Sequence, residues 1–312
     1  MGLFPKRKVS NGWLAIVPAG RRLDAIRART SADGKPVVEL ADSFEFDGDL
    51  PQILKRLRKP LGLVSQRCTT LLAHGQYQFL QTEAPDLAGG PIAEGAEIVR
   101  WKIKDMVEFE VTDAAIDLLP IPGEGRSPQV FAAVAPASSV APVVQGFQVA
   151  DVPLGVIDLP ELSQRNLARL FEDENRGLAT LIFDEIEGLL TFTFRGDLYV
   201  VRHVEISSSQ LTSADDDRRN TLFERIALDV QRSLDNFDRA FSQIPVSKVL
   251  VAPVPGAAGF IDYLRANLLL PVEALNLADK VDLSAVPALL DPLRQAQCLR
   301  ALGAAMRDEV SA

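Results

Sequence analysis

The side chains that most often carry chemistry are few in this sequence, and their spacing matches no known catalytic or metal-binding pattern. His74 and His203 are the only histidines, and neither belongs to an HxxxH, HExxH or Ser/His/Asp signature. Cys68 and Cys298 are far apart, with no CxxC or Cys/His spacing, which indicates neither a disulfide framework nor a zinc site. His203 alternates with apolar residues in the run LYVVRHVEI, so we expect a half-exposed strand residue there. The sequence therefore offers no metal centre and no general acid–base pair.

Composition and charge exclude two classes of protein. A hydrophobic content of 47% with 24% charged residues is typical of a folded globular chain and not of a disordered one. The net charge of −9 argues against nucleic-acid binding, which needs Lys and Arg clustered on one face. Small basic clusters at 6–8 and 55–59 are interpreted as ordinary solvated charge, with weak attraction to anionic lipid headgroups as the alternative.

The chain has no sequence feature of export or membrane insertion. Its N-terminal residues lack the apolar region of a secretory signal. The most apolar stretch, Val130 to Val144, is interrupted by prolines and too short to span a bilayer. With two isolated cysteines, we expect a cytoplasmic, reducing compartment.

The first half of the chain predicts a strand meander followed by mixed elements. Short apolar or alternating runs between turn-forming clusters predict three antiparallel strands between Trp13 and Phe46. Further strands are expected at Leu61–Ser65, Thr69–Ala73, Ala114–Leu119, Gln129–Val134 and Gly155–Ile157. Helices are expected from Leu50 to Pro60, around Val99 to Val107, from Ala137 to Phe147 with an interruption at Gly146, and from Asp158 to Phe171. Asp158 and Glu161 are expected to cap the last of these helices.

The second half repeats this order. Three strands are expected at Gly177–Asp184, Gly188–Phe194 and Asp197–Glu205, followed by a long amphipathic helix from Leu222 to Phe241. The acidic run Asp215–Asp217 precedes that helix, where carboxylates favour capping over metal binding. A strand at Lys248–Ala252, a helix at Ala257–Asn267, a strand at Val272–Leu275 and a final helix at Leu293–Arg307 complete the chain.

The repeated order predicts two lobes within the 312 residues. Each lobe starts with a three-stranded meander and continues with α/β units, which is the arrangement of the actin, hexokinase and heat-shock ATPase folds. We therefore predict an α/β chain with a two-lobed actin-like (ribonuclease H-like) ATPase fold, each lobe a mixed sheet with helices. The first lobe is expected at 1–157, with a small inserted subdomain at about 76–127, and the second lobe at 158–312.

Three stretches resemble a known family. They are IVRWKIKDMVEFEVTDAAIDLL from Ile98, VIDLPELSQRNLARLF from Val156, and RIALDVQRSLDNFDRAF from Arg225 with the later VLVAP and CLRALGAAMR. In this order they are similar to the MshI/PilM branch of the actin-like fold, which serves MSHA-type and related type IV pili. The resemblance implies a cytoplasmic platform, peripheral to the inner face of the inner membrane. It also implies that the platform binds the cytoplasmic tail of a single-span PilN-like or MshJ-like protein and works with other pilus assembly proteins.

An active member of such a fold needs a glycine-rich hairpin in each lobe, whose backbone N–H groups approach the phosphates, and carboxylates that position Mg²⁺ and water. In the first hairpin, AIVPAGRR, Val17 stands where an acid is expected and Pro18 has no N–H. Only Gly20 remains of the glycine pattern, followed by Arg21.

The second hairpin, FDEIEGLLTF, retains Asp184, but Glu185 and Glu187 at its tip would repel a polyphosphate. A later loop, VLVAPVPGAAGF, keeps two separated glycines in place of a Gly-Gly pair. The predicted remnant of a nucleotide cleft consists of Gly20, Arg21, Asp184, Gly188, Gly256 and Gly259. We expect a pseudo-ATPase without a cofactor. The alternative is a nucleotide-switched or hydrolysing member that binds Mg-ATP, with Asp184 positioning the metal.

The partner-binding surface is predicted on the amphipathic segment from Trp101 to Phe109. Tryptophan combines a large apolar face with one hydrogen-bond donor and is favoured in binding hot spots. The predicted lining residues are Trp101, Ile103, Lys104, Met106 and Phe109. An equal alternative is that Trp101 anchors its helix to the core. A second alternative for the whole chain is the cytoplasmic domain of a GspL-like type II secretion protein, which shares the fold and should carry a membrane segment after its second lobe.

Overall fold

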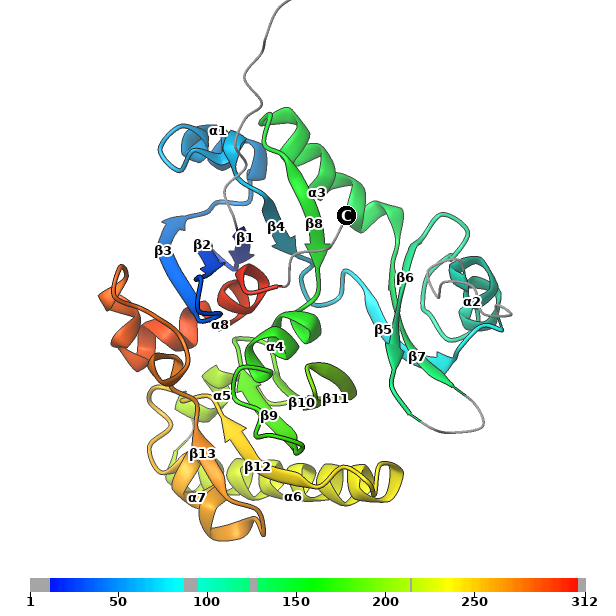
Figure 1. The fold of residues 1–312 in the computed structure, drawn as a ribbon, viewed down its shortest axis with the longest axis vertical. Helices are drawn as coiled ribbons and strands as arrows, with labels where there is room; N and C mark the ends of the chain where they lie inside the picture. The colour runs from blue at the N-terminus through cyan, green and yellow to red at the C-terminus, as the bar shows by residue number, and fades with distance from the viewer. Residues whose placement is uncertain (1–11, 87–94, 124–127, 214, 308–312) are drawn as a thin grey trace, which may run out of the picture.

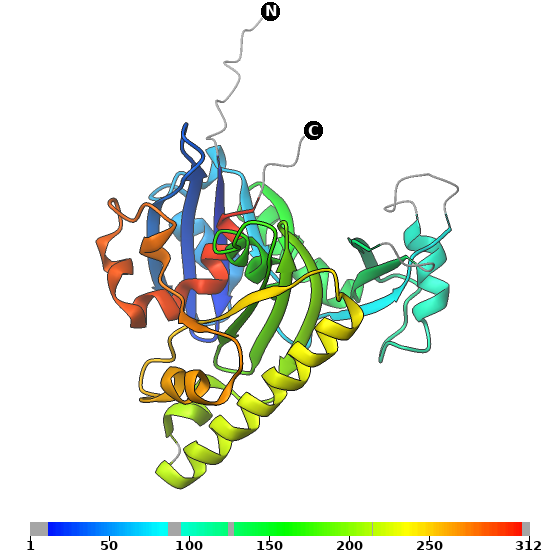
Figure 2. The same cartoon turned by 60° about the horizontal axis from the view of Figure 1, so that its bottom comes forward.

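The computed structural model describes residues 12–86, 95–123, 128–213 and 215–307. Figures 1 and 2 show two large lobes, one above the other in Figure 1, and a small subdomain projecting to one side. The basic cluster predicted at 6–8 lies outside the described residues.

The first lobe is built on a five-stranded sheet of order β3-β2-β1-β4-β8. Its strands are β1 (Trp13–Ala19), β2 (Arg22–Thr30), β3 (Pro36–Glu45), β4 (Cys68–Leu71) and β8 (Leu154–Asp158). The first three pair antiparallel, whereas β4 and β8 run parallel to β1. Side chains alternate across β1: Leu14 and Ile16 pack toward α1 (Leu50–Arg58) and α3 (Ala137–Val149), while Ala15 and Val17 pack toward α8 (Pro292–Ala305).

The second lobe repeats this plan with a sheet of order β11-β10-β9-β12-β13. Its strands are β9 (Gly177–Phe183), β10 (Gly188–Phe194), β11 (Asp197–Val204), β12 (Val246–Val251) and β13 (Val272–Ala274). The long helix α6 (Asp216–Ala240) and α7 (Phe260–Asn267) cover one face, and α4 (Pro160–Ala168) covers the other. The predicted stripe of α6 is confirmed, because Phe223, Ile226, Val230 and Phe237 are buried, and the Asp215 side chain caps the helix by accepting from the Arg218 N–H.

The inserted subdomain has its own antiparallel sheet of order β5-β7-β6. It contains β5 (Gln78–Glu83), α2 (Ala96–Ile103), β6 (Ala115–Ile121) and β7 (Gln129–Ala135). Val99 and Ile103 of α2 pack on this sheet, whereas Ile121 and Phe131 join the core of the second lobe. The sheet includes β7, so the subdomain extends beyond the predicted end at residue 127.

Several predicted elements differ in the structure. The strand expected at Leu61–Ser65 is a short 3-10 turn, η1 (Leu63–Ser65), preceded by Gly62 in the left-handed region at φ 61°. Strand β5 was not predicted. Helix α2 ends at Ile103, so Met106 and Val107 lie in the turns that follow it. Gly146 does not interrupt α3.

The start of α4 also differs from the predicted capping box. Its N-cap residue is Leu159, which has no side-chain cap. Asp158 instead accepts from the Leu159 N–H and pairs with Arg307 at 2.7 Å. Glu161 is turned into the interior, as described below.

The chain returns to the first lobe after β13. The segment that contains η3 (Leu277–Asp279) and η4 (Pro287–Leu290) passes the edge of β3, where Val38 donates its N–H to the Asp282 carbonyl at 3.0 Å. Helix α8 then packs on β1, β2 and β4. The end of the predicted second lobe, 158–312, therefore belongs spatially to the first.

Helices α4 and α8 cross between the lobes with almost no space between their backbones. A methyl group added at Gly303 of α8 would lie 2.1 Å from the carbonyl oxygen of Ser163 in α4. Two hydrogen bonds join the helices here, from Ser163 Oγ to the Arg300 carbonyl at 2.6 Å and from Asn166 Nδ2 to the Gly303 carbonyl at 3.0 Å. The crossing therefore requires glycine at position 303.

Replacing Gly303 with alanine should destabilise the protein. The added methyl meets backbone, which cannot move aside as a flexible side chain would, so we expect the free energy of unfolding to fall by about 2 kcal/mol, although alanine favours a helix by about 1 kcal/mol. Urea unfolding followed by circular dichroism measures the change. Gly123→Ala is the matched control, since a methyl there meets nothing within 4 Å; its change should stay within about 0.5 kcal/mol. Equal stability of the two variants would contradict the tight crossing.

Candidate functional site

Two hairpin turns meet at the boundary between the lobes. The β1–β2 turn contains Gly20, which has a φ of 59°. A methyl group added at Gly20 would lie 3.4 Å from Oε2 of Glu185, in the turn between β9 and β10. The structure therefore brings together the two hairpins that the sequence singled out, and places a carboxylate of one against the glycine of the other.

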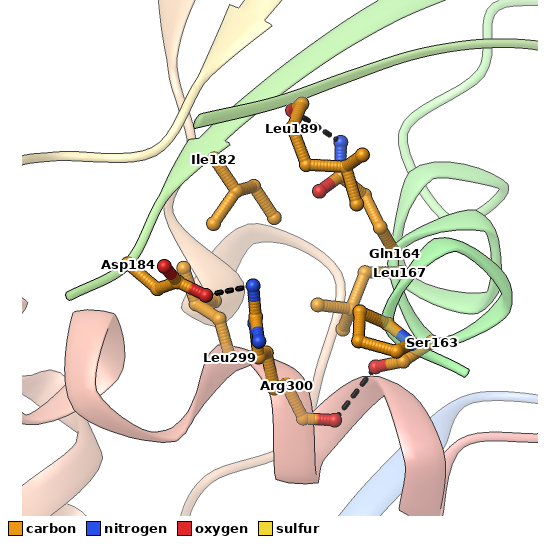
Figure 3. A pocket seen from close by; sticks show the side chains of 9 residues that line it. Ser163, Gln164, Leu167, Ile182, Asp184, Leu189, Leu299 and Arg300 are labelled. Atoms are coloured by element: carbon orange, nitrogen blue, oxygen red, sulfur yellow. Dashed lines mark hydrogen bonds and ion pairs between the residues drawn. The ribbon is translucent and has the colours of Figure 1, made fainter. Parts of the chain in front are cut away.

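Asp184 is held by contacts on both of its carboxylate oxygens. Oδ1 accepts the backbone N–H groups of Ile186 at 2.7 Å and Glu187 at 2.9 Å, which shapes the turn. Oδ2 forms an ion pair with the guanidinium of Arg300 in α8 (Figure 3). Both oxygens that a metal ion would need are already engaged within the chain.

The space around this ion pair is small. It is lined by α4, α8, β9 and β10, with Gln164, Leu189 and Ile182 facing Arg300 (Figure 3). Gln164 Nε2 donates to the carbonyls of Thr180 and Leu189, at 2.8 and 2.9 Å, and so joins α4 to the sheet. The cavity has a volume of only about 10 Å³, whereas pockets for small-molecule ligands measure roughly 300–1,000 Å³. These residues do not fit a magnesium-bound polyphosphate at this hairpin.

The predicted glycines of the second lobe have local structural roles. Gly188 is buried, and a methyl there would lie 2.5 Å from the Phe183 ring. Gly256 and Gly259 have φ values of 91° and 78°, which glycine adopts without strain. Gly259 is the N-cap residue of α7, and Gly256 lies against Thr212 of α5 (Ser208–Ser213).

Arg21 is exposed and faces a different space. It lines a cavity of about 360 Å³ on the first lobe, together with Glu45, Asp47, Gln52 and Arg56. Two guanidinium groups and two carboxylates share this lining, so no single ligand charge is favoured there.

The α2 segment presents an apolar face to solvent. Trp101 is 71% exposed, Met106 is 50% exposed and Ile98, which the sequence analysis did not select, is 43% exposed. Lys104 is also exposed, and Phe109 is half-buried. Ile103 is fully buried in the subdomain core, so its predicted place on a binding surface is wrong. Trp101 likewise does not anchor its helix to the core.

The sequence analysis missed a group of ionisable side chains between the lobes. Glu161 of α4 is only 1% exposed and accepts a hydrogen bond from Tyr77 Oη, at 2.8 and 3.0 Å to its two oxygens. His203 of β11 lies between Glu161 and Glu187, and His74 also reaches Glu187. His203 is a partly exposed strand residue as predicted, but its alternation gave no sign of these partners. No local sequence pattern marked the group, because the burial of the polar residues on α4 appears only in the structure.

Burial and these contacts shift the pKa values of the group. Burial raises the pKa of Glu161 above its ordinary value, and burial also raises that of Tyr77. The hydrogen bond to Glu187 raises the pKa of His203, against the opposing effect of burial. Burial opposes ionisation of Glu187, but its contacts with His203 and His74 lower the pKa below the ordinary value.

Neither a metal cluster nor a membrane span is found among the described residues. In the ranges that the structure describes, no three His, Cys, Asp or Glu side chains are placed to hold a metal ion. No helix in those ranges has both the length and the apolar character to cross a bilayer.

Comparison with known proteins shows the fold. No protein-family model matches the chain, and no curated protein matches its sequence. A solved structure described as a PilM–PilN type IV pilus biogenesis complex aligns with 96% of this chain and 98% of its own, with a TM-score of 0.73 and 19% identity. Two others are a Bacteroides thetaiotaomicron protein with an actin-like ATPase fold and unknown function, and the cytoplasmic domain of EpsL from the Vibrio cholerae type II secretion system. The first covers 93% of this chain and 100% of its own at 9% identity and a TM-score of 0.49. The EpsL domain aligns with 86% of this chain and with 92% of its own length, at 11% identity and a TM-score of 0.48. The predicted two-lobed actin-like fold is confirmed.

Removing the Asp184 side chain should destabilise the hairpin. Asp184→Ala leaves two turn N–H groups and the Arg300 guanidinium without their acceptor, so we expect the free energy of unfolding to fall by about 2 kcal/mol. Chemical denaturation measures the loss. Glu185→Ala, at the exposed tip of the same turn, should change stability by less than about 0.5 kcal/mol. A loss of the same size in both variants would show that the Asp184 contacts do not hold the turn.

Proposed function

We propose that this chain is a scaffold of type IV pilus assembly, of the MSHA-like branch, that binds the cytoplasmic tail of a PilN-like inner-membrane protein and does not hydrolyse ATP. It works in the cytoplasm, at the inner face of the inner membrane. The observation that carries the proposal is the exposed side chain of Trp101 on α2, in a chain with this fold.

Fold similarity supports the class of partner. A structure that aligns with 96% of the chain, at a TM-score of 0.73, is of a PilM–PilN complex. At 19% identity the likeness concerns the fold, so the partner assignment rests on the surface as well. An adaptor that holds a short peptide needs an accessible apolar face on a rigid element, as α2 presents with Ile98 and Trp101 one helical turn apart.

The surroundings of Trp101 suit a peptide partner. Large exposed apolar side chains that are rimmed by charge are typical of interaction sites. Lys104 and Lys102 flank the tryptophan, and the aliphatic parts of lysine side chains extend apolar contact while the ammonium group remains in water. The helix itself is fixed by Val99 and Ile103 in the subdomain core, so little ordering is needed when a partner binds.

The interlobe contacts support a role without hydrolysis. Asp184 is paired with Arg300, Glu185 lies against Gly20, and the cavity beside the Asp184–Arg300 pair has room for roughly one water molecule. A triphosphate would have to displace the ion pair and separate the hairpins. A scaffold needs no such opening.

Truncating Trp101 should weaken tail binding. A peptide with the cytoplasmic tail of a PilN-like single-span protein from the same organism is the probe, and fluorescence anisotropy measures its affinity. Trp101→Ala should raise Kd at least about tenfold, because buried aromatic anchors contribute about 2 kcal/mol or more to binding. Leu269→Ala is the matched control, since Leu269 is 91% exposed on the second lobe and should leave Kd unchanged. Unchanged affinity in Trp101→Ala, with the fold intact by circular dichroism, would remove α2 as the binding surface.

Calorimetric titration with Mg-ATP tests whether the chain binds nucleotide, which ATP hydrolysis would require. We expect no binding heat at micromolar nucleotide, because Asp184 already has an internal cation and the cavity is too small. Micromolar binding by the native chain that disappears in Asp184→Asn would establish the nucleotide-binding alternative. The scaffold role would then have to include a nucleotide switch.

A further inference from the structure

Five ionisable side chains from four segments meet where the lobes join. His74 and Tyr77 lie in the connection from β4 of the first lobe to β5 of the inserted subdomain. Glu161 comes from the first turn of α4, Glu187 from the turn between β9 and β10, and His203 from β11. The β10–β11 hairpin brings Glu187 to His203, whereas Tyr77 and Glu161, 84 residues apart, meet only through tertiary structure.

The two histidines and two glutamates form a connected chain of contacts. His203 Nδ1 is 2.9 Å from Glu187 Oε1, and its Nε2 is 3.6 Å from Glu161 Oε1. His74 Nδ1 is 3.3 Å from the same Glu187 oxygen. One imidazole therefore bridges two carboxylates, and the second imidazole contacts one of them.

Two of these contacts cross between lobes. The contact of His74 with Glu187 and the hydrogen bond of Tyr77 with Glu161 both join the segment after β4 to the second lobe and its linking helix. The segment that carries His74 is a tight turn, with Gly75 at φ 79° and the Ala73 N–H donating to Gln76 Oε1 at 2.8 Å. The turn holds His74 in place, so opening of the lobes would separate it from Glu187.

Protonation decides how many of these contacts are favourable. A neutral imidazole donates from one nitrogen and accepts at the other, whereas both nitrogens of imidazolium donate. Neutral His203 therefore leaves one carboxylate facing a ring lone pair, and protonated His203 satisfies both Glu187 and Glu161. The other charged groups near the cluster are Arg300, close to Glu161 and Tyr77, and Asp184, which is paired with Arg300.

We propose that His74, Tyr77, Glu161, Glu187 and His203 form a proton-controlled latch between the lobes, which closes when His203 is protonated and loosens when His203 loses its proton. The latch acts on the relative position of the lobes and of the inserted subdomain that carries α2. It does not depend on the identity of the partner proposed above.

The direction of the pH effect follows from the sign of each shift. The pKa of His203 is raised in the folded state, so its contribution is complete below the ordinary imidazole pKa and is lost as pH rises through the higher folded value. Burial raises the pKa of Glu161, so ionising it at higher pH also weakens the closed state. Glu187, whose pKa is lowered, contributes above its ordinary pKa and loses that contribution only in acid. The latch is therefore strongest in weak acid, between the pKa of Glu187 and that of His203.

The chain is well suited to a test because it has few histidines and no reactive surface cysteine among the described residues. Its only two histidines are both in the latch. Histidine is the side chain whose ordinary pKa lies between about 5 and 8, and burial raises the pKa of both cysteine thiols to about 12. Both cysteines are buried, so cysteines introduced at the surface can be spin-labelled selectively.

Double electron–electron resonance on the full chain measures the opening. Nitroxides are placed at Lys55→Cys on α1 of the first lobe and Asp238→Cys on α6 of the second, both exposed. We expect one narrow distance distribution at about pH 6 and a broader distribution with a longer component at about pH 9. Glu187→Gln should show the longer component at both pH values, and His203→Gln should lose the pH response.

Glu185→Gln is the matched control, because Glu185 lies in the same turn but contacts neither histidine. It should retain the response of the native chain. An identical distribution at both pH values in the native chain would overturn the proposal, as would a native-like response in both Glu187→Gln and His203→Gln. Thermal unfolding at about pH 6 confirms that each variant is folded before its distances are compared.

Discussion

Because Gly303 has no side chain, α8 reaches the backbone of α4 and the two lobes are joined through helices in direct contact. The rest of the interlobe structure depends on this approach. It places Arg300, one turn before Gly303, within reach of Asp184, and it places Ser163 and Asn166 where they bond to the backbone of α8. A wider crossing would leave these polar groups buried without partners, which costs about 1–3 kcal/mol for each group.

The turn between β9 and β10 forms side-chain contacts in two directions. Toward α8, Asp184 pairs with Arg300; toward β11 and the first lobe, Glu187 pairs with His203 and His74. From the sequence, Glu185 and Glu187 at the tip of this turn are expected to repel a polyphosphate. In the structure, Glu187 contacts His203 and His74, and Glu185 lies against Gly20 of the first lobe. The features that argue against a nucleotide are therefore also the features that join the lobes.

Much of the fold was predictable because it follows from local periodicity. The two meanders and the stripe of α6 are visible as alternating and helical spacing, and α6 even shows its Asp215 cap. The prediction failed where local pattern and tertiary structure disagree. Leu61–Ser65 is apolar enough for a strand, but Gly62 in the left-handed region turns the chain. Strand β5 has half-buried residues on both faces, so it lacks clear alternation. The spatial return of α8 to the first lobe has no local signal.

The same contrast between local pattern and tertiary structure applies to the residues of the candidate site. Gly20 and Asp184 were identifiable because turn residues keep a recognisable local pattern, and Trp101 because tryptophan is favoured in binding hot spots; its exposure is visible only in the structure. The latch was not identifiable, since His74, Glu161 and His203 each look ordinary in their own segments. Its members meet only because the inserted subdomain leaves the first lobe between β4 and α3 and packs on β11. Packing of Phe131 and Ile121 into the second-lobe core brings the His74 turn to Glu187. The insertion that carries the apolar face of α2 therefore begins with two members of the latch, His74 and Tyr77, so movement of the lobes would also move the surface that carries Trp101.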